Sequence, residues 1–160
     1  MSSDLLRNYI FITSAYWIFT LTDGALRMLV LLHFYLIGYD AFQIAVLFIF
    51  YETAGVITNL VGGWLGARLG LKSTLLSGLT LQVLALSGMA NIDPNWPLWQ
   101  SVGFVMAMQA LSGVAKDLTK MSAKSAVRLI LEQNDNQVLF KWVAILTGSK
   151  NTLKGLGFFL

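Results

Sequence analysis

Four apolar stretches, each long enough to cross a membrane as a helix, constrain this sequence more than any other feature. They cover residues 10–36, 41–65, 73–90 and 98–116. A helix that spans the hydrocarbon core of a bilayer needs about 20 mostly apolar residues. Backbone polar groups inside the bilayer must be paired within the protein, so a chain with such stretches spans it as helices. The sequence therefore predicts an all-α membrane protein.

Residues 138–160 form a fifth stretch, which is apolar except for a polar interruption at residues 147–151. We expect an unfinished fifth helix that lines a cavity. The alternative is a short interfacial helix, a loop and the start of a span at Gly155. The sequence ends within apolar residues, which is typical of a fragment. We therefore expect residues 1–160 to be the incomplete N-terminal transmembrane bundle of a longer protein.

Composition agrees with a polytopic membrane protein and excludes several function classes. Hydrophobic residues make up 56% of the chain and charged residues 12%, whereas soluble domains carry about 25% charged residues. There is no cysteine and one histidine, His33, so we expect neither a disulfide nor a metal site nor a cofactor. No nucleophile–base arrangement or phosphate loop points to an enzyme. The basic residues alternate with apolar spans, which argues against a nucleic-acid partner.

The distribution of Lys and Arg predicts the orientation in the membrane. The turns around Asp40 and Asp93, after the first and third stretches, hold no basic residue. The segments before the first stretch and after the second and fourth stretches are basic. These segments contain Arg7, Arg68, Lys72, Lys116, Lys120, Lys124 and Arg128. Basic loops remain on the cytoplasmic side. We expect a multi-pass protein of the plasma membrane, a bacterial inner membrane, with a cytoplasmic N-terminus.

Asp23 and Arg27 lie in the middle of the first apolar stretch. A charged side chain at the centre of a bilayer costs at least about 2.5–3.5 kcal/mol, so such residues face a partner or a wet cavity. The two residues are four positions apart and can pair on one helix face. The functional interpretation is a substrate or proton site. The structural interpretation is an ion pair that holds helices together.

The second stretch carries Glu52 and Asn59, which are seven positions apart and so lie on one helix face. Gly55 between them permits close packing with another helix. Glu52 could bridge to Arg27, carry a proton or serve as a buried neutral contact. The sequence leaves these three alternatives open.

Two further sets of cations complete the predicted site. Lys116 and Lys120 begin a ladder of like charges at the expected cytoplasmic end of the fourth span, and like charges at this spacing repel. They set topology and contact anionic lipid headgroups, or they draw an anionic substrate into the cavity. Lys150 lies near the middle of the fifth stretch, at the depth of Arg27. Two converging cations suit a multiply charged anion, although Lys150 as an interfacial loop residue is the alternative.

The segment after the second stretch resembles a signature of the major facilitator superfamily. That motif has a glycine, three residues, aspartate, arginine, any residue, glycine, any residue and a basic residue. Gly63, Arg68, Gly70 and Lys72 match it. Ala67 stands where the family has the aspartate that helps to latch the cytoplasmic gate. The resemblance implies a gating loop, with the latch itself altered.

A closer resemblance is to the organoarsenical efflux permeases (ArsJ-type). It is carried by residues 19–27, 58–68, 115–125 and 141–151. The resemblance implies export of 1-arseno-3-phosphoglycerate, which a glyceraldehyde-3-phosphate dehydrogenase makes when it uses arsenate, and hence arsenate resistance. It also implies alternating access by a twelve-helix transporter whose other half lies beyond this chain.

In that mechanism the small anionic substrate binds Arg27 and Lys150 near the midplane, with Lys116 and Lys120 at the cytoplasmic mouth. Asp23 or Glu52 would carry the coupling proton if proton antiport drives export. Two alternatives remain. One is a symporter of another anionic organophosphate or carboxylate, and the other is a membrane subunit that does not transport.

Overall fold

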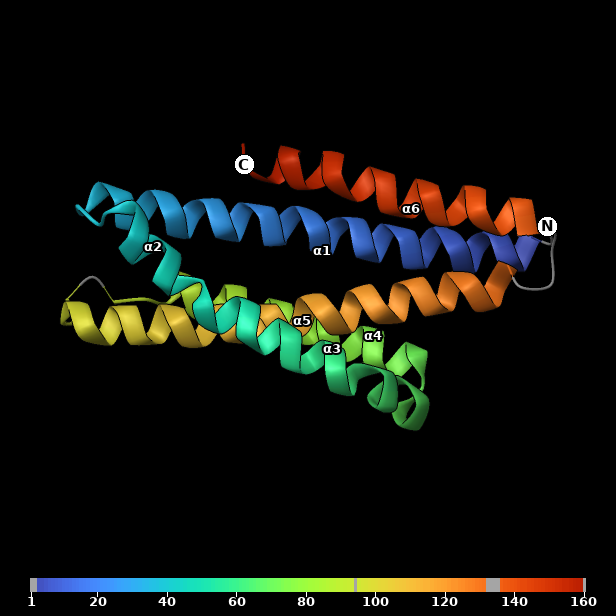
Figure 1. Ribbon diagram of the computed structural model, residues 1–160, viewed down its shortest axis with the longest axis horizontal. Helices are drawn as coiled ribbons and strands as arrows, with labels where there is room; N and C mark the ends of the chain where they lie inside the picture. The colour runs from blue at the N-terminus through green and yellow to red at the C-terminus, as the bar shows by residue number, and fades with distance from the viewer. Residues whose placement is uncertain (1–2, 94, 132–135, 160) are drawn as a thin grey trace.

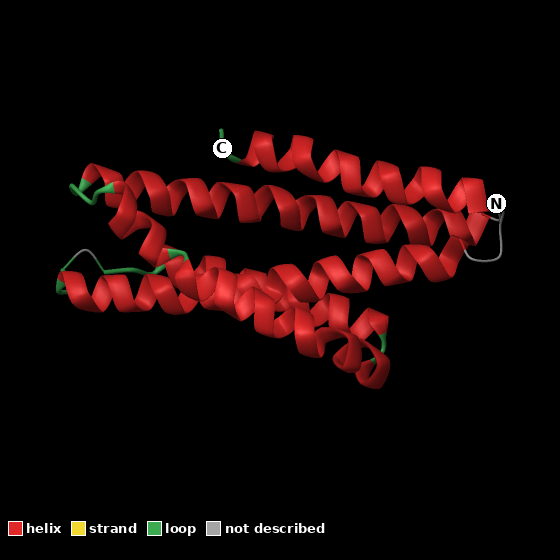
Figure 2. Ribbon diagram, in the orientation of Figure 1, coloured by secondary structure: helices red, strands yellow, loops and turns green. Residues whose placement is uncertain are grey.

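The computed structural model describes residues 3–93, 95–131 and 136–159, and within these ranges every regular element is an α-helix (Figure 2). The helices are α1 (Ser3–Leu36), α2 (Ala41–Leu47), α3 (Ile49–Leu69), α4 (Leu71–Ala90), α5 (Leu98–Leu131) and α6 (Asn136–Gly157). This confirms the predicted all-α class.

Four helical segments within the described residues are long and apolar enough to cross a membrane. They are Leu6–Leu36, Ala41–Leu69, Leu71–Ala90 and Leu98–Leu129. The helix α6 is continuous, in agreement with the expected helix over this region and against a loop before Gly155. It does not qualify as a span by the same measure, because Lys141, Lys150 and Lys154 reduce its apolar character.

Successive long helices run in opposite directions (Figure 1). The helices α1, α4 and α6 point one way, whereas α3 and α5 point the other way. The helix α5 packs most extensively against α3 and α4, and α1 packs against α6 and α5. Such alternation is what a chain that crosses a bilayer repeatedly with short connections requires.

The second predicted helix differs from the expectation of one helix over residues 41–65. It is divided at Phe48 into α2 and α3. Asp40 caps α2 through a capping box with Gln43: its side chain accepts from the Gln43 amide at 2.8 Å, and its own amide donates to the Gln43 side chain at 3.0 Å. The Phe48 amide donates to the Ala45 carbonyl, three residues earlier, at 3.1 Å. An α-helix has a bond to the residue four positions earlier, so the regular pattern is interrupted at Phe48.

The gating loop that the resemblance implies after the second stretch is not a loop of several residues. The helix α3 continues to Leu69 and α4 begins at Leu71, so Gly70 alone separates them. The Gly70 amide donates to the Gly66 carbonyl at 3.0 Å, and Gly70 has a φ of 81°. Glycine adopts a positive φ without a steric penalty, so one residue is enough to reverse the chain here.

Two apolar clusters stabilise the bundle at different levels of α1. One contains Tyr9, Tyr16, Ala123, Val127 and Leu146 from α1, α5 and α6. The other contains Leu26, Val30, Phe34, Ile44, Leu47 and Val105 from α1, α2 and α5. Thr20 and Asp23 of α1 lie between the two clusters along the chain, and Arg27 directly follows the first α1 residue of the second cluster. The fold thus places a charged site between two apolar cores.

Candidate functional site

A cavity of about 190 Å³ lies among α1, α3, α5 and α6. The residues that line it are Tyr16, Phe19, Thr20, Asp23, Arg27, Glu52, Lys116, Lys120, Lys150 and Lys154. Pockets for drug-sized ligands have volumes of about 300–1,000 Å³. The size of this cavity therefore suits a small metabolite.

The helix α1 contributes one continuous face to the cavity. Its residues at positions 16, 19, 20, 23 and 27 all line the cavity, and they recur with the three- and four-residue spacing of a helix face. The Thr20 hydroxyl donates to the Tyr16 carbonyl at 2.8 Å, so its polarity is satisfied within the helix. Asp23 and Arg27 are left to make contacts with other helices.

Tyr51 of α3 is the buried centre of the charged cluster, with 0% of its surface exposed. Its hydroxyl donates to Asp23 Oδ1 at 2.5 Å. Arg27 Cζ lies 4.0 Å from the centre of its ring, and Lys116 Nζ lies 4.2 Å from it. Cations are attracted to an aromatic ring face, so Tyr51 connects α1, α3 and α5 through one side chain.

Glu52, next to Tyr51, bridges the same two cations. Arg27 Nη2 donates to Glu52 Oε1 at 2.8 Å, and Lys116 Nζ donates to Glu52 Oε2 at 3.5 Å. The predicted pair of Arg27 and Asp23 is present but long, with 3.9 Å between Nε and Oδ2. Of the alternatives that the sequence left open for Glu52, the structure contains the bridge to Arg27.

Asp117 of α5 supplies a buried carboxylate beside the cavity and is only 2% exposed. It accepts a hydrogen bond from Asn59 Nδ2 at 3.0 Å and pairs with Lys120 Nζ at 3.4 Å. Lys116 Nζ is 3.9 Å away. A Cβ built at Gly55 would lie 2.5 Å from Asp117 Oδ2, so a glycine at this position makes room for the carboxylate.

Lys150 and Lys154 bring two more cations from α6. Within the described part of the chain, no carboxylate lies within ion-pairing distance of either ammonium group. One contact that positions α6 against α1 is the hydrogen bond from the Trp17 indole to Ser149 Oγ at 2.8 Å. Another is a close approach at Gly24, where a built Cβ would lie 2.8 Å from the Lys154 carbonyl oxygen.

The charges that line the cavity do not balance. Five cationic side chains face two carboxylates, those of Asp23 and Glu52. Asp117 lies behind Lys116 and Lys120 and offsets part of the excess. A small cavity with a surplus of positive charge favours an anion, which would interact with several fixed cations at once.

The residues predicted to bind substrate and to carry the proton lie together in space. Arg27, Lys116, Lys120 and Lys150 line the one cavity, together with Asp23 and Glu52. The substrate and proton roles assigned to them remain predictions. The location of Lys116 and Lys120 at a cytoplasmic mouth also stays a prediction. Both lie near the middle of α5, where Lys116 pairs with Glu52 of α3 and Lys120 pairs with the buried Asp117. Their carboxylate partners allow them to lie inside the bundle.

Three residues of the cluster were missed in the predicted site. Tyr51 gave no sequence signal beyond its place beside Glu52. Asp117 was visible only as an acidic residue among basic neighbours. Lys154 is four residues after Lys150 and therefore on the same helix face. This spacing was the one signal that could have added Lys154 to the site.

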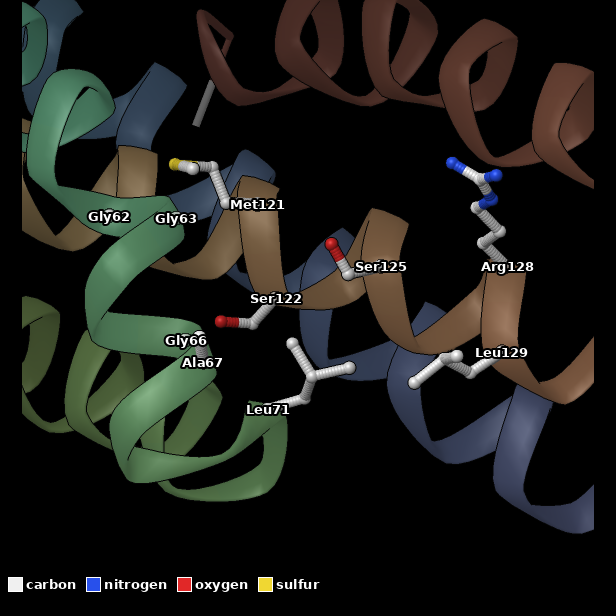
Figure 3. Close-up of a pocket in the computed structure, with 10 residues that line it drawn as sticks. All are labelled: Gly62, Gly63, Gly66, Ala67, Leu71, Met121, Ser122, Ser125, Arg128 and Leu129. Carbon is white, nitrogen blue, oxygen red and sulfur yellow. The ribbon is translucent and has the colours of Figure 1, made fainter.

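The residues of the predicted gating motif lie elsewhere. Gly63 and Ala67 line a second cavity of about 420 Å³ between α3 and α5 (Figure 3). The other lining residues are Gly62, Gly66, Leu71, Met121, Ser122, Ser125, Arg128 and Leu129. The remaining motif residues, Arg68, Gly70 and Lys72, do not line it, and Arg68 Cζ lies 5.1 Å from the ring centre of Trp64. Ala67 contributes a methyl group where the motif would have a carboxylate.

No family model, curated protein sequence or solved structure matches the chain. Within the described residues, no group of three His, Cys, Asp or Glu side chains is arranged to hold a metal ion. The chain is thus defined by its own features: apolar helices that can span a membrane and a small cation-rich cavity between them.

Proposed function

We propose that the chain is the N-terminal half of a membrane efflux transporter of the major facilitator type. Its substrate is a small organic anion with several negative charges, and 1-arseno-3-phosphoglycerate is the specific candidate. The observation that carries the proposal is the convergence of five cations from α1, α5 and α6 on one cavity with only two lining carboxylates. Fixed cations among membrane-spanning helices mark a substrate or ion pathway.

The mechanism that fits these side chains is alternating access around a fixed anion site. Arg27 and Lys116 from one side, and Lys150 and Lys154 from α6, neutralise the anion while it is away from bulk water. Asp23 or Glu52 carries a coupling proton in the antiport version of this mechanism. The arsenical substrate and the association with a glyceraldehyde-3-phosphate dehydrogenase depend on the sequence resemblance described above.

Arsenate resistance of cells that express the full-length protein with the dehydrogenase tests the proposal. Arg27→Ala and Lys150→Ala should each abolish resistance, because each removes a cation from the cavity. Lys141→Ala is the matched control, since Lys141 is exposed on the same helix as Lys150 and lies outside the cavity. Unchanged resistance in both cavity variants would refute the proposal, provided that they reach the membrane in normal amounts.

Two rival functions give different results in membrane vesicles. A symporter of another organophosphate or carboxylate would take the anion into the cell, so inverted vesicles would lose it instead of accumulating it. A subunit that does not transport would show no flux in either orientation. Accumulation in inverted vesicles that requires Arg27 and Lys150 supports export.

A further inference from the structure

Four of the five cations of the cavity form two groups that differ in their partners, and the fifth, Lys120, pairs with Asp117 at 3.4 Å. Arg27 and Lys116 share the carboxylate of Glu52, with distances of 2.8 Å and 3.5 Å. Lys150 and Lys154 have no ion-pair partner among the described residues. One cationic group therefore has a carboxylate of the protein as its partner, and the other can receive an anion without displacing one.

Glu52 differs from the other two carboxylates of the cluster in its exposure. Its side chain is 58% exposed, whereas the side chains of Asp23 and Asp117 are 6% and 3% exposed. Asp23 accepts from the buried Tyr51 hydroxyl, and Asp117 accepts from Asn59. Both of these are anchored, while both contacts described for Glu52 go to the cations it neutralises. Of the three carboxylates, Glu52 is therefore the one that can move away from its present position without leaving a buried hydrogen-bond donor such as Tyr51 or Asn59 unpaired.

Arg27 and Lys116 do not depend on Glu52 for their positions. Both lie against the ring of Tyr51, at 4.0 Å and 4.2 Å from its centre. Arg27 also has Asp23 at 3.9 Å, and Lys116 has Asp117 at the same distance. The two cations would therefore stay in place when Glu52 moves away, which leaves a ready-made site for another anionic group.

We propose that Glu52 is a displaceable internal counter-anion, which occupies the Arg27–Lys116 site until an anionic group of the substrate replaces it. This inference rests on the proposed function and adds a requirement on the substrate. The substrate must carry two separate anionic groups, one for Lys150 and Lys154 and one that displaces Glu52. An anion with a single charged group binds at the open lysines alone and leaves Glu52 in place.

Binding of two probes to the purified full-length protein in nanodiscs tests this inference by isothermal titration calorimetry. Inorganic phosphate has one anionic group, and 3-phosphoglycerate has two. Glu52→Gln removes the competing charge, so 3-phosphoglycerate should bind about three- to ten-fold more tightly, the size of one or two solvent-exposed ion pairs. The affinity for inorganic phosphate should stay within about two-fold of the wild type, since phosphate does not compete with Glu52.

Asp23→Asn is the matched control. It removes one negative charge beside the same arginine, but Asp23 is buried and held by Tyr51, so no tighter binding of 3-phosphoglycerate is expected. Equal gains in both variants, or an equal gain for both probes, would mean that only the overall charge matters and would overturn the inference. Weaker binding of 3-phosphoglycerate to Glu52→Gln would make Glu52 a positioning residue and would overturn it as well.

A second pair of variants keeps the test independent of how Glu52→Gln folds. Lys150→Gln should lose binding of both probes, whereas Arg27→Gln should lose only the advantage of 3-phosphoglycerate over phosphate. Loss of both probes in Arg27→Gln would contradict the two-group arrangement. If the wild type binds 3-phosphoglycerate and Glu52→Gln gains nothing, the inference fails and the proposed function stands. If the wild type binds neither probe, both fail.

Discussion

Arg27 of α1 and Glu52 of α3 are 25 residues apart in sequence and form the shortest ion pair of the described cavity, with 2.8 Å between Nη2 and Oε1. The pair joins the first two membrane-spanning segments at the level of the cavity. It also brings Tyr51 against the guanidinium group. The charge in the middle of α1 is therefore balanced mainly by another helix and only weakly by its own neighbour Asp23.

The Tyr51 hydroxyl should stabilise the fold through Asp23. Tyr51→Phe removes the hydrogen bond to a carboxylate that is 4% exposed, and leaving a buried acceptor unpaired costs about 1–3 kcal/mol. We expect a lower free energy of unfolding by that amount in detergent micelles. Tyr35→Phe is the control, because Tyr35 is 66% exposed. Equal stability of the two variants would contradict the role of the buried hydrogen bond.

The close approach of α1 and α6 should be sensitive to one methyl group. A Cβ at Gly24 would lie 2.8 Å from a backbone oxygen of Lys154, so Gly24→Ala should separate the helices and lower stability by about 1–3 kcal/mol. Displacement of Lys154 should also weaken binding of 3-phosphoglycerate. Gly103→Ala meets no atom within 4 Å and should be neutral or stabilising, since alanine favours a helix over glycine. The reverse order of stabilities would refute this packing.

Asn59 and Asp117 should be energetically coupled across α3 and α5. Their side chains are joined at 3.0 Å, and contacting residues show interaction energies of about 0.5–3 kcal/mol in double-mutant cycles. We expect a coupling in this range from Asn59→Ala, Asp117→Ala and the double variant, measured by chemical unfolding. The control cycle combines Asn59→Ala with Asp40→Ala, because the Asp40 side chain bonds to Gln43 at the start of α2 instead of to Asn59. Additive effects for Asn59 and Asp117 would contradict the contact.

The proposed orientation can be tested with single cysteines, because residues 1–160 contain none. Ile37→Cys lies in the turn after α1, and Lys72→Cys lies at the start of α4. A membrane-impermeant thiol reagent should label position 37 in intact cells and position 72 only in inverted vesicles. This follows from the excess of basic residues on the side of Lys72. The opposite pattern would place the N-terminus outside the cytoplasm.

The helices were largely predictable, because they depend on local properties. Apolar length located the four segments that are long and apolar enough to cross a membrane. The errors lie where one residue changes the path of the backbone. Phe48 divides the second helix, and Gly70 replaces an expected loop. Neither effect alters the hydropathy that the prediction used.

The candidate site was predictable in its components but not in its connections. Arg27 and Lys150 could be selected because cations are costly in an apolar segment. The distance between Asp23 and Arg27 followed from helix geometry, but the preference of Arg27 for Glu52 did not. That preference depends on how α1 and α3 are rotated about their axes, and packing of side chains far apart in sequence sets this rotation.

By itself, the sequence determined that this chain forms apolar helices with charged residues in their middle, since helix period, length and hydropathy are properties of neighbouring residues. Only the tertiary structure decided which charges neutralise each other. Burial of Tyr51 between Arg27 and Lys116 brings three helices together, and the same packing leaves Lys150 and Lys154 without a carboxylate among the described residues. Electrostatic pairing acts over a few ångströms, so it depends on contacts that only the folded bundle creates.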